Sequence, residues 1–460
     1  MVPYEPIDWG GKNVVQDQMV NLSLIPNEEF YQEFERGFNV VNGDLTSATY
    51  RALVNFTESV NYPRHRWFYY REGFSPELVN ALIKEFDVPE DGLICDPFCG
   101  AGTTLSVAHE RNLRSIGFEV NPFSAFVGQV KTRDYSEKEL MLLEQVITEL
   151  VTNEFDYEVA LPENDYLTKI FGQEMLFELL RIKEFIIQID DAKVRDLIFL
   201  SWLNSLEPVA KYRKAGNGLK IKKKANKNSA LSPRDQILHQ MNSTLEMIKV
   251  DLASTSSFRT EPIIYEESAM DMHQFLQGEQ LDAVIFSPPY ANCFDYTKIY
   301  YMELWMGDFI KTRSDQKDVR MKSVRSHVHA TWPTRYENYY LSELHDVLLP
   351  AVRSQKLWTN RIPDMLKGYF EDMNVVLNNI YKALRPGGSC AIVVSNSSYG
   401  GIIIPTDVIL AASAKNIGFT VKEIEVERLI ITSSQQYKVT EGLRRFLRES
   451  TVKIQKPYET

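Results

Sequence analysis

The chain has 460 residues, of which 44% are hydrophobic and 25% are charged, as in an ordinary water-soluble globular protein. Its formal net charge of −11 argues against a protein coated uniformly with nucleic acid, although local basic patches still permit binding. The first residues have neither the basic nor the apolar part of a signal peptide, and no stretch approaches roughly 18 uninterrupted apolar residues. We therefore expect a cytoplasmic protein with one large α/β domain and an accessory lobe.

The four cysteines are Cys95, Cys99, Cys293 and Cys390, and no two of them form a CxxC pair. This spacing predicts neither a disulfide framework nor a zinc ribbon. We expect all four thiols to be reduced.

Residues 1–60 form a mostly polar extension about which the sequence says little. Beyond it, short apolar runs of the kind found in parallel sheets alternate with helical patterns, and each run ends in a turn rich in polar residues or glycine. These runs lie at 93–96, 115–119, 263–268, 282–286 and 388–395, the last after a turn at 384–387. The alternation predicts a doubly wound α/β sheet that binds its ligands at the carboxyl ends of the strands.

The turn after the first run contains two glycines, Gly100 and Gly102, followed by Thr103 and Thr104 at the start of a helix. Glycine lets the backbone approach a ligand closely, and the free amides of a helix start can hold an anionic group. Glu119 follows about 20 residues later at the end of the second run, where a carboxylate can accept hydrogen bonds from both ribose hydroxyls. The dinucleotide pattern GxGxxG is absent, so the loop does not require a pyrophosphate.

The fourth run ends in Ser287, Pro288, Pro289 and Tyr290. Two successive prolines remove two backbone donors and force an extended chain. A buried strand that ends this way presents a rigid edge with a hydroxyl on one side and an aromatic ring on the other.

Together these motifs resemble those of the amino-directed DNA methyltransferases. DPFCGAGTT (96–104) is similar to their cofactor loop, SPPY (287–290) to their catalytic motif, and HRWFYYREGFSPELVNALI (65–83) to the segment that closes over the methionine end of S-adenosylmethionine. The resemblance covers roughly 65–130 and 260–460, and it implies a seven-stranded, mostly parallel, Rossmann-like sheet with a helical insertion lobe. It assigns to S-adenosylmethionine the residues Ser75, Asp96, Phe98, Gly100, Gly102, Thr103, Thr104, Glu119 and Glu267.

The resemblance also gives the SPPY edge a chemical purpose. The lone pair of an exocyclic amine is delocalised into its ring, so the enzyme must hold the nitrogen with acceptors that favour a tetrahedral geometry. The Ser287 side chain and the Pro288 carbonyl would be those acceptors, and they would act mainly by orientation and placed dipoles. Tyr290 would stack on a base that has been flipped out of its duplex.

A second mechanism would use Cys99 or Cys293 as a thiolate that attacks cytosine C6. The carbon-5 enzymes that work in this way have a Pro-Cys dipeptide in the strand-four loop, whereas this chain has Pro-Pro-Tyr. We therefore expect no covalent intermediate.

Three of the assigned cofactor residues have an ordinary structural explanation as well. Glu267 would bind the adenine amine or be a solvated carboxylate at a helix start. Phe98 would pack on the cofactor or belong to the core. Ser75, which precedes Pro76 and Glu77, reads as a helix N-cap whose neighbouring amides suit the cofactor carboxylate, and capping alone explains it equally well.

Residues 133–258 are too long for a simple connection, and their apolar periodicity is helical, so we expect a separate lobe. Within it, 211–227 is rich in Lys and Arg and contains no acid. It is either a solvated loop or a contact to DNA phosphates, and we favour phosphates because the active site acts on nucleic acid. Its candidate contacts are Lys211, Arg213, Lys214, Lys220, Lys222, Lys223 and Lys224.

A second excursion, 306–368, leaves the sheet directly after SPPY, and we take it as part of target recognition. Its basic stretch 311–335 includes Arg320 and Arg325 as candidate DNA contacts, with His327, His329 and Trp332 interleaved. Two histidines at i and i+2 do not by themselves predict a metal site. The tail after about residue 418 reads as two strands that close the sheet as an antiparallel edge.

These observations predict a methyltransferase that modifies an exocyclic amine in double-stranded DNA, with cytosine N4 favoured over adenine N6. The alternatives are an RNA methyltransferase acting on a guanine amine, against which Ser287 argues, and a DNA-recognition subunit that binds the cofactor without turnover. Restriction or defence proteins are possible partners, and the target sequence is not readable from the chain.

Overall fold

An eight-stranded sheet organises the computed structural model, which describes residues 25–42, 61–71, 73–154, 157–216, 218–223, 231–254, 260–332, 339–430 and 440–458. The sheet is parallel from β8 to β6, and β12 is antiparallel to both of its neighbours. In spatial order its strands are β1 (Val40–Asn42), β11 (Thr420–Leu429), β12 (Arg448–Gln455), β8 (Leu384–Ser395), β7 (Leu281–Phe286), β2 (Leu93–Asp96), β3 (Arg114–Phe118) and β6 (Ile263–Tyr265).

This arrangement confirms the predicted doubly wound, mostly parallel α/β sheet. The two tail strands pair antiparallel as expected, but β1 lies outside them, parallel to β11, and forms the true edge. The expected turn at 384–387 is wrong, because those residues already belong to β8. Gly387, with φ +78°, accommodates an irregular register there, and its amide donates to the Lys456 carbonyl.

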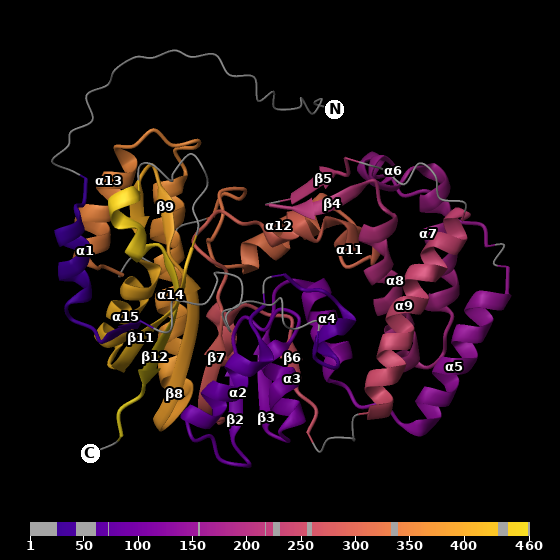
Figure 1. Ribbon diagram of the computed structural model, residues 1–460, viewed down its shortest axis with the longest axis horizontal. Helices are drawn as coiled ribbons and strands as arrows, with labels where there is room; N and C mark the ends of the chain where they lie inside the picture. Colours follow the sequence, from indigo (N-terminus) through magenta and orange to yellow (C-terminus); the bar gives the residue numbers. More distant parts are fainter. Residues whose placement is uncertain are drawn as a thin grey trace.

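Helices cover both faces of the sheet (Figure 1). Those packed around it are α1 (Glu28–Glu35), α2 (Pro76–Glu85), α3 (Thr103–Glu110), α4 (Pro122–Thr132), η4 (Ala269–Gln274), α14 (Ile362–Ala383), α15 (Thr406–Ile417) and η6 (Glu441–Phe446), whereas η3 (His65–Trp67) packs against α9 (Pro233–Ser254). Between β7 and α14 lie α10 (Tyr296–Ile299), α11 (Tyr301–Met306), α12 (Arg313–Lys322), the π-helix η5 (Glu343–Leu348) and α13 (Leu349–Arg353). In the described part of the chain, no helix is both long and apolar enough to cross a membrane.

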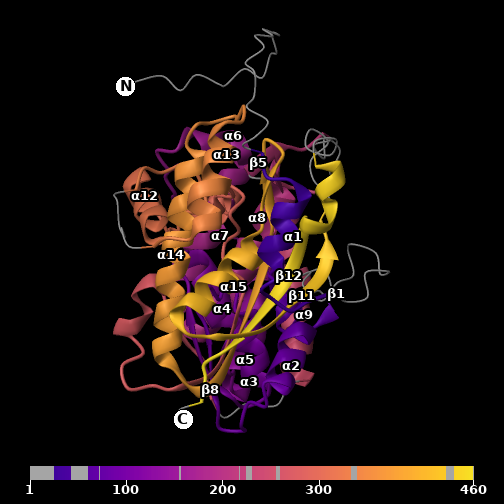
Figure 2. The same cartoon turned by 90° about the vertical axis from the view of Figure 1, so that its left-hand side faces the viewer.

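The central strand β7 shows why its sequence is apolar without interruption. Ala283 and Ile285 pack in the cluster that contains α2 and α3, whereas Val284 and Phe286 pack in the cluster that contains α14 and α15. Figure 2 shows α14 and α15 on one side of β8 and β12, with α2 on the other. A strand buried on both faces needs apolar residues at every position.

The helices of 133–258 pack together on the far side of the molecule from β11 and β12 (Figure 1). They are α5 (Glu137–Thr152), α6 (Asp165–Phe171), α7 (Gln173–Ile187), α8 (Ala192–Val209) and α9 (Pro233–Ser254), with a hairpin of β4 (Tyr212–Ala215) and β5 (Gly218–Ile221). Their hydrophobic cluster also includes Phe123 of α4 and Leu304 of α11. The helical lobe is therefore joined to the sheet domain by shared core packing, and its limits as a domain stay a prediction.

The second excursion divides into two parts. Val324, Leu344 and Ile362 are buried in the same cluster as β7 and β8, so this portion belongs to the main core. By contrast, α12 has no buried residue. Another short hairpin, β9 (Ser397–Tyr399) with β10 (Ile402–Ile404), follows β8.

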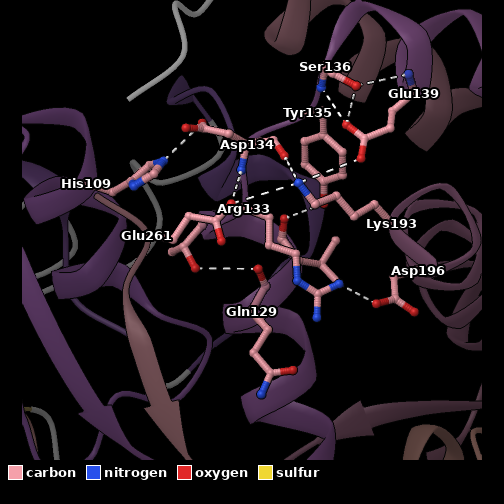
Figure 3. Close-up of polar contacts among 12 residues, drawn as sticks. His109, Gln129, Arg133, Asp134, Tyr135, Ser136, Glu139, Lys193, Asp196 and Glu261 are labelled. Atoms are coloured by element: carbon pink, nitrogen blue, oxygen red, sulfur yellow. Dashed lines mark hydrogen bonds and ion pairs between the residues drawn. The ribbon is translucent and has the colours of Figure 1, made fainter. Parts of the chain in front are cut away.

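Polar contacts fix the path of the chain from α4 into the lobe (Figure 3). Asp134 accepts from His109 of α3 at 3.2 Å through its carboxylate and from Lys193 of α8 at 2.7 Å through its carbonyl. Arg133 pairs with Asp196 of α8, and Ser136 forms a capping box with Glu139 at the start of α5. The connection is thus held on both sides.

Asp251 of α9 makes a second junction, with the segment that leads to the cofactor region. Only 1% of Asp251 is exposed, and its carboxylate accepts from the Arg64 amide at 2.9 Å and the Trp67 indole at 2.8 Å. It also pairs with the Arg66 guanidinium. One buried carboxylate therefore accepts hydrogen bonds from three residues of the segment.

Replacing Asp251 with alanine should lower the free energy of unfolding by on the order of 3 kcal/mol, because buried donors lose their acceptor. Urea denaturation of the purified chain measures this change. Glu246→Ala is the matched control on the same helix, since that carboxylate is 65% exposed and its removal should cost about 0.5 kcal/mol or less. Equal destabilisation by the two variants would contradict the role given to Asp251.

Candidate active site

An open cavity lies at the carboxyl edge of the sheet. It is lined by the turns that follow β2, β3, β6 and β7, by the segment before α2, and by residues from α12 to His327. Of the predicted cofactor residues it contains Asp96, Phe98, Gly100, Thr103, Glu119 and Glu267, and of the predicted catalytic residues Ser287 and Pro289. The structure thus brings the two predicted motifs to one place.

The glycine loop after β2 is shaped by protein contacts. Gly100 has φ +51°, and an added Cβ would lie 3.0 Å from the Tyr70 ring. Gly102 has φ +81°, and its added Cβ would lie 3.1 Å from the Cα of Gly128 in α4. Both glycines are therefore needed for backbone conformation and close packing, whatever ligand is bound.

Two of the assigned loop residues do not face the cavity. Gly102 is the N-cap of α3, and the buried Thr104 hydroxyl donates to the Ile285 carbonyl at 3.2 Å. Ser75 is also buried away from the cavity, and it caps α2 by accepting from the Leu78 amide at 3.2 Å. The N-cap interpretation of Ser75 is the one that the geometry supports, while its neighbours Gly73 and Phe74 line the cavity.

Glu119 is held with both carboxylate oxygens on backbone amides. Gly100 donates to one oxygen at 3.0 Å and Asn121 to the other at 2.7 Å. Burial raises the pKa of Glu119 to about 7, although these hydrogen bonds act in the opposite direction. The side chain is therefore an oriented acceptor that gains or loses a proton near neutral pH.

Asp96 behaves in the same way on the neighbouring strand. Burial raises its pKa to about 7, although the Phe98 amide, which donates to the carboxylate at 3.0 Å, acts in the opposite direction. The negative charge of Glu119 contributes a smaller increase. A positively charged ligand in the cavity would favour the ionised form of both acids.

Phe98 and Glu267 line the cavity without further indication of their role. The Phe98 ring lies 5.7 Å from that of Phe286, so it also contacts the core. Glu267 pairs with Lys322 of α12 at 3.0 Å, across the cavity wall. Both assignments stay predictions.

At the end of β7, Ser287 has a defined hydrogen bond. Its hydroxyl donates to the Val393 carbonyl of β8 at 3.0 Å, which leaves the oxygen lone pairs available as acceptors. Pro288 is buried and, like Tyr290, is not part of the cavity lining. The Tyr290 hydroxyl donates to Glu449 at 2.5 Å and lies 3.5 Å from the Ser287 oxygen.

One wall of the cavity joins Asp295, on the loop after SPPY, to the stretch 311–335 that the sequence assigned to target recognition, and Asp295 was not singled out by the sequence. Asp295 is buried there and accepts from Arg320 at 2.9 Å. His327 lies beside it, and burial lowers its pKa to about 4, so its imidazole is neutral at physiological pH. Its position five residues after Tyr290 is the feature of the sequence that could have pointed to Asp295 as a site residue.

Asp295, His327 and His329 form a group whose potential ligand atoms lie within 4.8 Å of one another among the described residues. Both Asp295 oxygens, however, already accept hydrogen bonds, Oδ2 from Arg320 and Oδ1 from Thr297. Burial also lowers the pKa of His329. The arrangement is a hydrogen-bonded wall of the cavity.

Two of the predicted DNA contacts are wrong, because they are buried. Lys214 is 4% exposed, pairs with Glu303 at 2.5 Å and lies 4.5 Å above the Tyr300 ring. Arg325 is 8% exposed and pairs with Glu371 and Asp372 of α14. Sequence spacing cannot distinguish such internal cations from surface ones.

The remaining predicted contacts vary in exposure. Arg320 forms an ion pair with Asp295, and Lys222 donates to two backbone carbonyls of α8. Lys224 lies outside the described residues. The exposed basic residues of the hairpin region are Lys211, Arg213, Lys220 and Lys223, and those near α12 that the sequence did not single out are Lys311, Arg313, Lys317 and Lys322, the last paired with Glu267.

Both cysteines considered as nucleophiles are buried. Burial raises the pKa of the Cys99 thiol well above its usual range and also raises that of Cys293. The Cys293 sulfur lies 3.5 Å from the Tyr399 hydroxyl. Neither thiol is set up to ionise and attack a base.

The titration of Glu119 predicts a pH-dependent affinity for S-adenosylmethionine. Ribose hydroxyls donate to the ionised carboxylate, so binding should be strongest above pH 7 and weaken by up to about tenfold per pH unit below it. Calorimetry from pH 6 to 8 measures the slope in the wild type and in Glu119→Gln. The cofactor's own amine titrates identically for both proteins, so equal slopes would remove Glu119 from the binding site.

Comparison with known proteins agrees with this geometry. A family model described as DNA methylase matches residues 27–125. The chain is 28% identical over 432 residues to the type II methyltransferase M.AvaI of Nostoc sp., covering 88% of this chain and 89% of that protein. It is 27% identical to the type II methyltransferase M.BsoBI of Geobacillus stearothermophilus, covering 84% of each, and 20% identical to the type II methyltransferase M.MvaI of Kocuria varians, covering 75% of this chain and 80% of that protein. The sheet, its two motif-bearing turns and these similarities support the predicted resemblance to the S-adenosylmethionine-dependent, amino-directed DNA methyltransferases.

Proposed function

We propose that the protein transfers a methyl group from S-adenosylmethionine to an exocyclic amine of a base flipped out of DNA, with cytosine N4 as the preferred acceptor. The observation that carries this proposal is the single cavity shared by Ser287 and Pro289 with Gly100 and Glu119. Transfer requires the methyl donor and the amine to meet within one enclosure, and two separate pockets would not permit it.

The cofactor supplies a methyl group bonded to a positively charged sulfur. Glu119 would accept hydrogen bonds from its ribose, and Asp96 would stabilise the positive charge nearby. The Ser287 hydroxyl donates its proton to the Val393 carbonyl. Its oxygen would therefore accept a hydrogen bond from the amine, as would the Pro288 carbonyl. Two acceptors orient the amine hydrogens and favour a tetrahedral nitrogen with its lone pair on the methyl group.

Tyr290 would supply the stacking surface for the flipped base. Burial and the neighbouring Glu449 carboxylate raise the pKa of its hydroxyl well above the usual range, so the ring stays neutral. A neutral aromatic ring stacks on any base, and base identity would then be read by hydrogen bonds at the edge.

Two exposed basic regions would hold the DNA backbone. The β4–β5 hairpin and α12 both contact α10, which follows directly on the SPPY loop. Figure 1 shows both between the sheet and the helical lobe. Their exposed Lys and Arg side chains form a local positive surface on a chain of net negative charge, which suits contacts to phosphates.

Cytosine N4 is preferred to adenine N6 because the serine at 287 resembles the first residue of the cytosine motif. A guanine-directed RNA enzyme and a silent cofactor-binding subunit are the alternatives. The names of the type II relatives favour DNA and turnover. A cytoplasmic location and restriction or defence partners stay predictions.

Product analysis separates these possibilities. The purified chain is incubated with labelled S-adenosylmethionine and either duplex DNA or transfer RNA, and the nucleic acid is digested to nucleosides. We expect labelled N4-methylcytosine from DNA. N6-methyladenine would select the adenine alternative, N2-methylguanine from RNA would select the RNA alternative, and cofactor binding without labelled product would select the silent subunit. Labelled 5-methylcytosine would contradict an amine-directed mechanism.

Ser287→Ala should lower the single-turnover rate of methyl transfer by on the order of a hundredfold, because the missing acceptor matters most in the transition state. Affinities for cofactor and DNA should remain close to those of the wild type. Ser395→Ala is the control, since that serine ends the neighbouring strand β8 but does not line the cavity. A wild-type rate in Ser287→Ala would rule out the acceptor role.

Replacing Lys211, Arg213, Lys220 and Lys223 with alanine should weaken DNA binding for all sequences alike. The dependence of log K on log salt should become shallower by about 0.9 for each phosphate that the variant no longer binds. Fluorescence anisotropy over a salt series measures both effects. A control variant carries the same charge change at Lys84, Lys138, Lys382 and Lys422, which are exposed elsewhere. If both variants bind DNA equally weakly, the hairpin has no specific role.

A further inference from the structure

The hydroxyl group of Tyr290 forms a hydrogen bond with a residue of the antiparallel part of the sheet. Its hydroxyl donates to the Glu449 carboxylate at 2.5 Å, across a sequence separation of 159 residues. Glu449 belongs to β12 and is 3% exposed. Strand pairing places it opposite Ser395 at the end of β8, two residues beyond the carbonyl that anchors Ser287.

Glu449 is itself held from the other side. The Arg428 guanidinium of β11 donates to its second oxygen at 2.5 Å. The carboxylate therefore has one oxygen on a cation and the other on the tyrosine. A buried carboxylate is costly unless it is paired, and the ion pair with Arg428 supplies much of that compensation. Pairing with Arg428 alone does not require a bond to Tyr290, so the second contact needs its own explanation.

We propose that Glu449 is a positioning residue that fixes the plane of the Tyr290 ring for stacking against the flipped base. This inference rests on the function proposed above and extends it to a residue far from both motifs. Glu449 would touch neither cofactor nor base and would act only through the tyrosine.

The geometry explains how one hydrogen bond can orient a ring. The prolines fix the backbone at the start of the side chain, and a phenol O–H bond prefers to lie in the plane of its ring. A fixed acceptor at the other end therefore favours one ring plane. Because the Ser287 oxygen lies 3.5 Å from the Tyr290 hydroxyl, a displaced ring would also disturb the acceptor for the amine.

A double-mutant cycle tests the inference, because it isolates an effect that passes through one partner. The variants are Tyr290→Phe, Glu449→Ala and the double variant, with single-turnover methyl transfer as the first readout. The second is the fluorescence of 2-aminopurine at the target position, which reports stacking. Each single variant should slow transfer roughly tenfold or more and change the bound fluorescence, as expected for removing one hydrogen bond to a charged group. The double variant should be no slower than the slower single variant.

Glu425→Ala is the matched control, since this carboxylate lies on β11 and pairs with Lys453 instead. It should transfer methyl groups at the wild-type rate. If Glu449→Ala does not fold, Glu449→Gln replaces it in the cycle, because its amide oxygen keeps an acceptor and should retain part of the rate. With either variant, the effect of the Glu449 substitution should disappear in the Tyr290→Phe background.

Rate losses that multiply in the double variant would overturn the inference, as would a wild-type rate in the Glu449 variants. Both results presuppose an active wild-type protein. If the wild type itself methylates no nucleic acid, the proposed function fails first. The two failures are therefore distinguishable.

Discussion

The parallel pairing of β2 with β7 is the constraint on which the site depends. Ile94 lies beside Ala283 and Cys95 beside Val284, so the two strands end at the same level of the sheet. The cofactor loop and the SPPY loop then leave neighbouring strands at one edge, although nearly two hundred residues separate them. Shifting this register by one residue would reverse the sides of Asp96 and Ser287 relative to each other.

Hydrogen bonds within the protein organise the cavity before any ligand arrives. Glu119 is held by two amides, Ser287 by a carbonyl and Tyr290 by a carboxylate. Groups fixed in this way need little reorganisation during reaction, which is how placed dipoles accelerate chemistry. Burial raises the pKa of both Asp96 and Glu119, and a cofactor that carries positive charge would favour their ionised forms.

Local sequence was sufficient where function depends on consecutive residues. The apolar runs, the glycine loop and SPPY each indicate a strand end or a turn through their own chemistry, so the fold and the shared edge could be predicted. The exposure of individual side chains could not be predicted. In the sequence, Lys214 and Arg325 look like surface cations, and only tertiary packing brings Glu303 and Asp372 to them. The same reason hides Glu449 of β12, whose partner Tyr290 lies in the loop that follows β7. The edge strand β1 was missed because three residues carry too little periodicity to predict pairing.

The central claim is that one cavity joins the methyl donor to an exocyclic amine held by Ser287. A crystal structure of the protein with a non-transferring analogue of S-adenosylmethionine and a duplex containing the target base tests it most directly. The account predicts a flipped base with its amine nitrogen in hydrogen-bond contact with the Ser287 oxygen and about 3–3.5 Å from the position of the transferable methyl group. A base that remains stacked in the duplex, or an analogue bound away from Gly100 and Glu119, would contradict it.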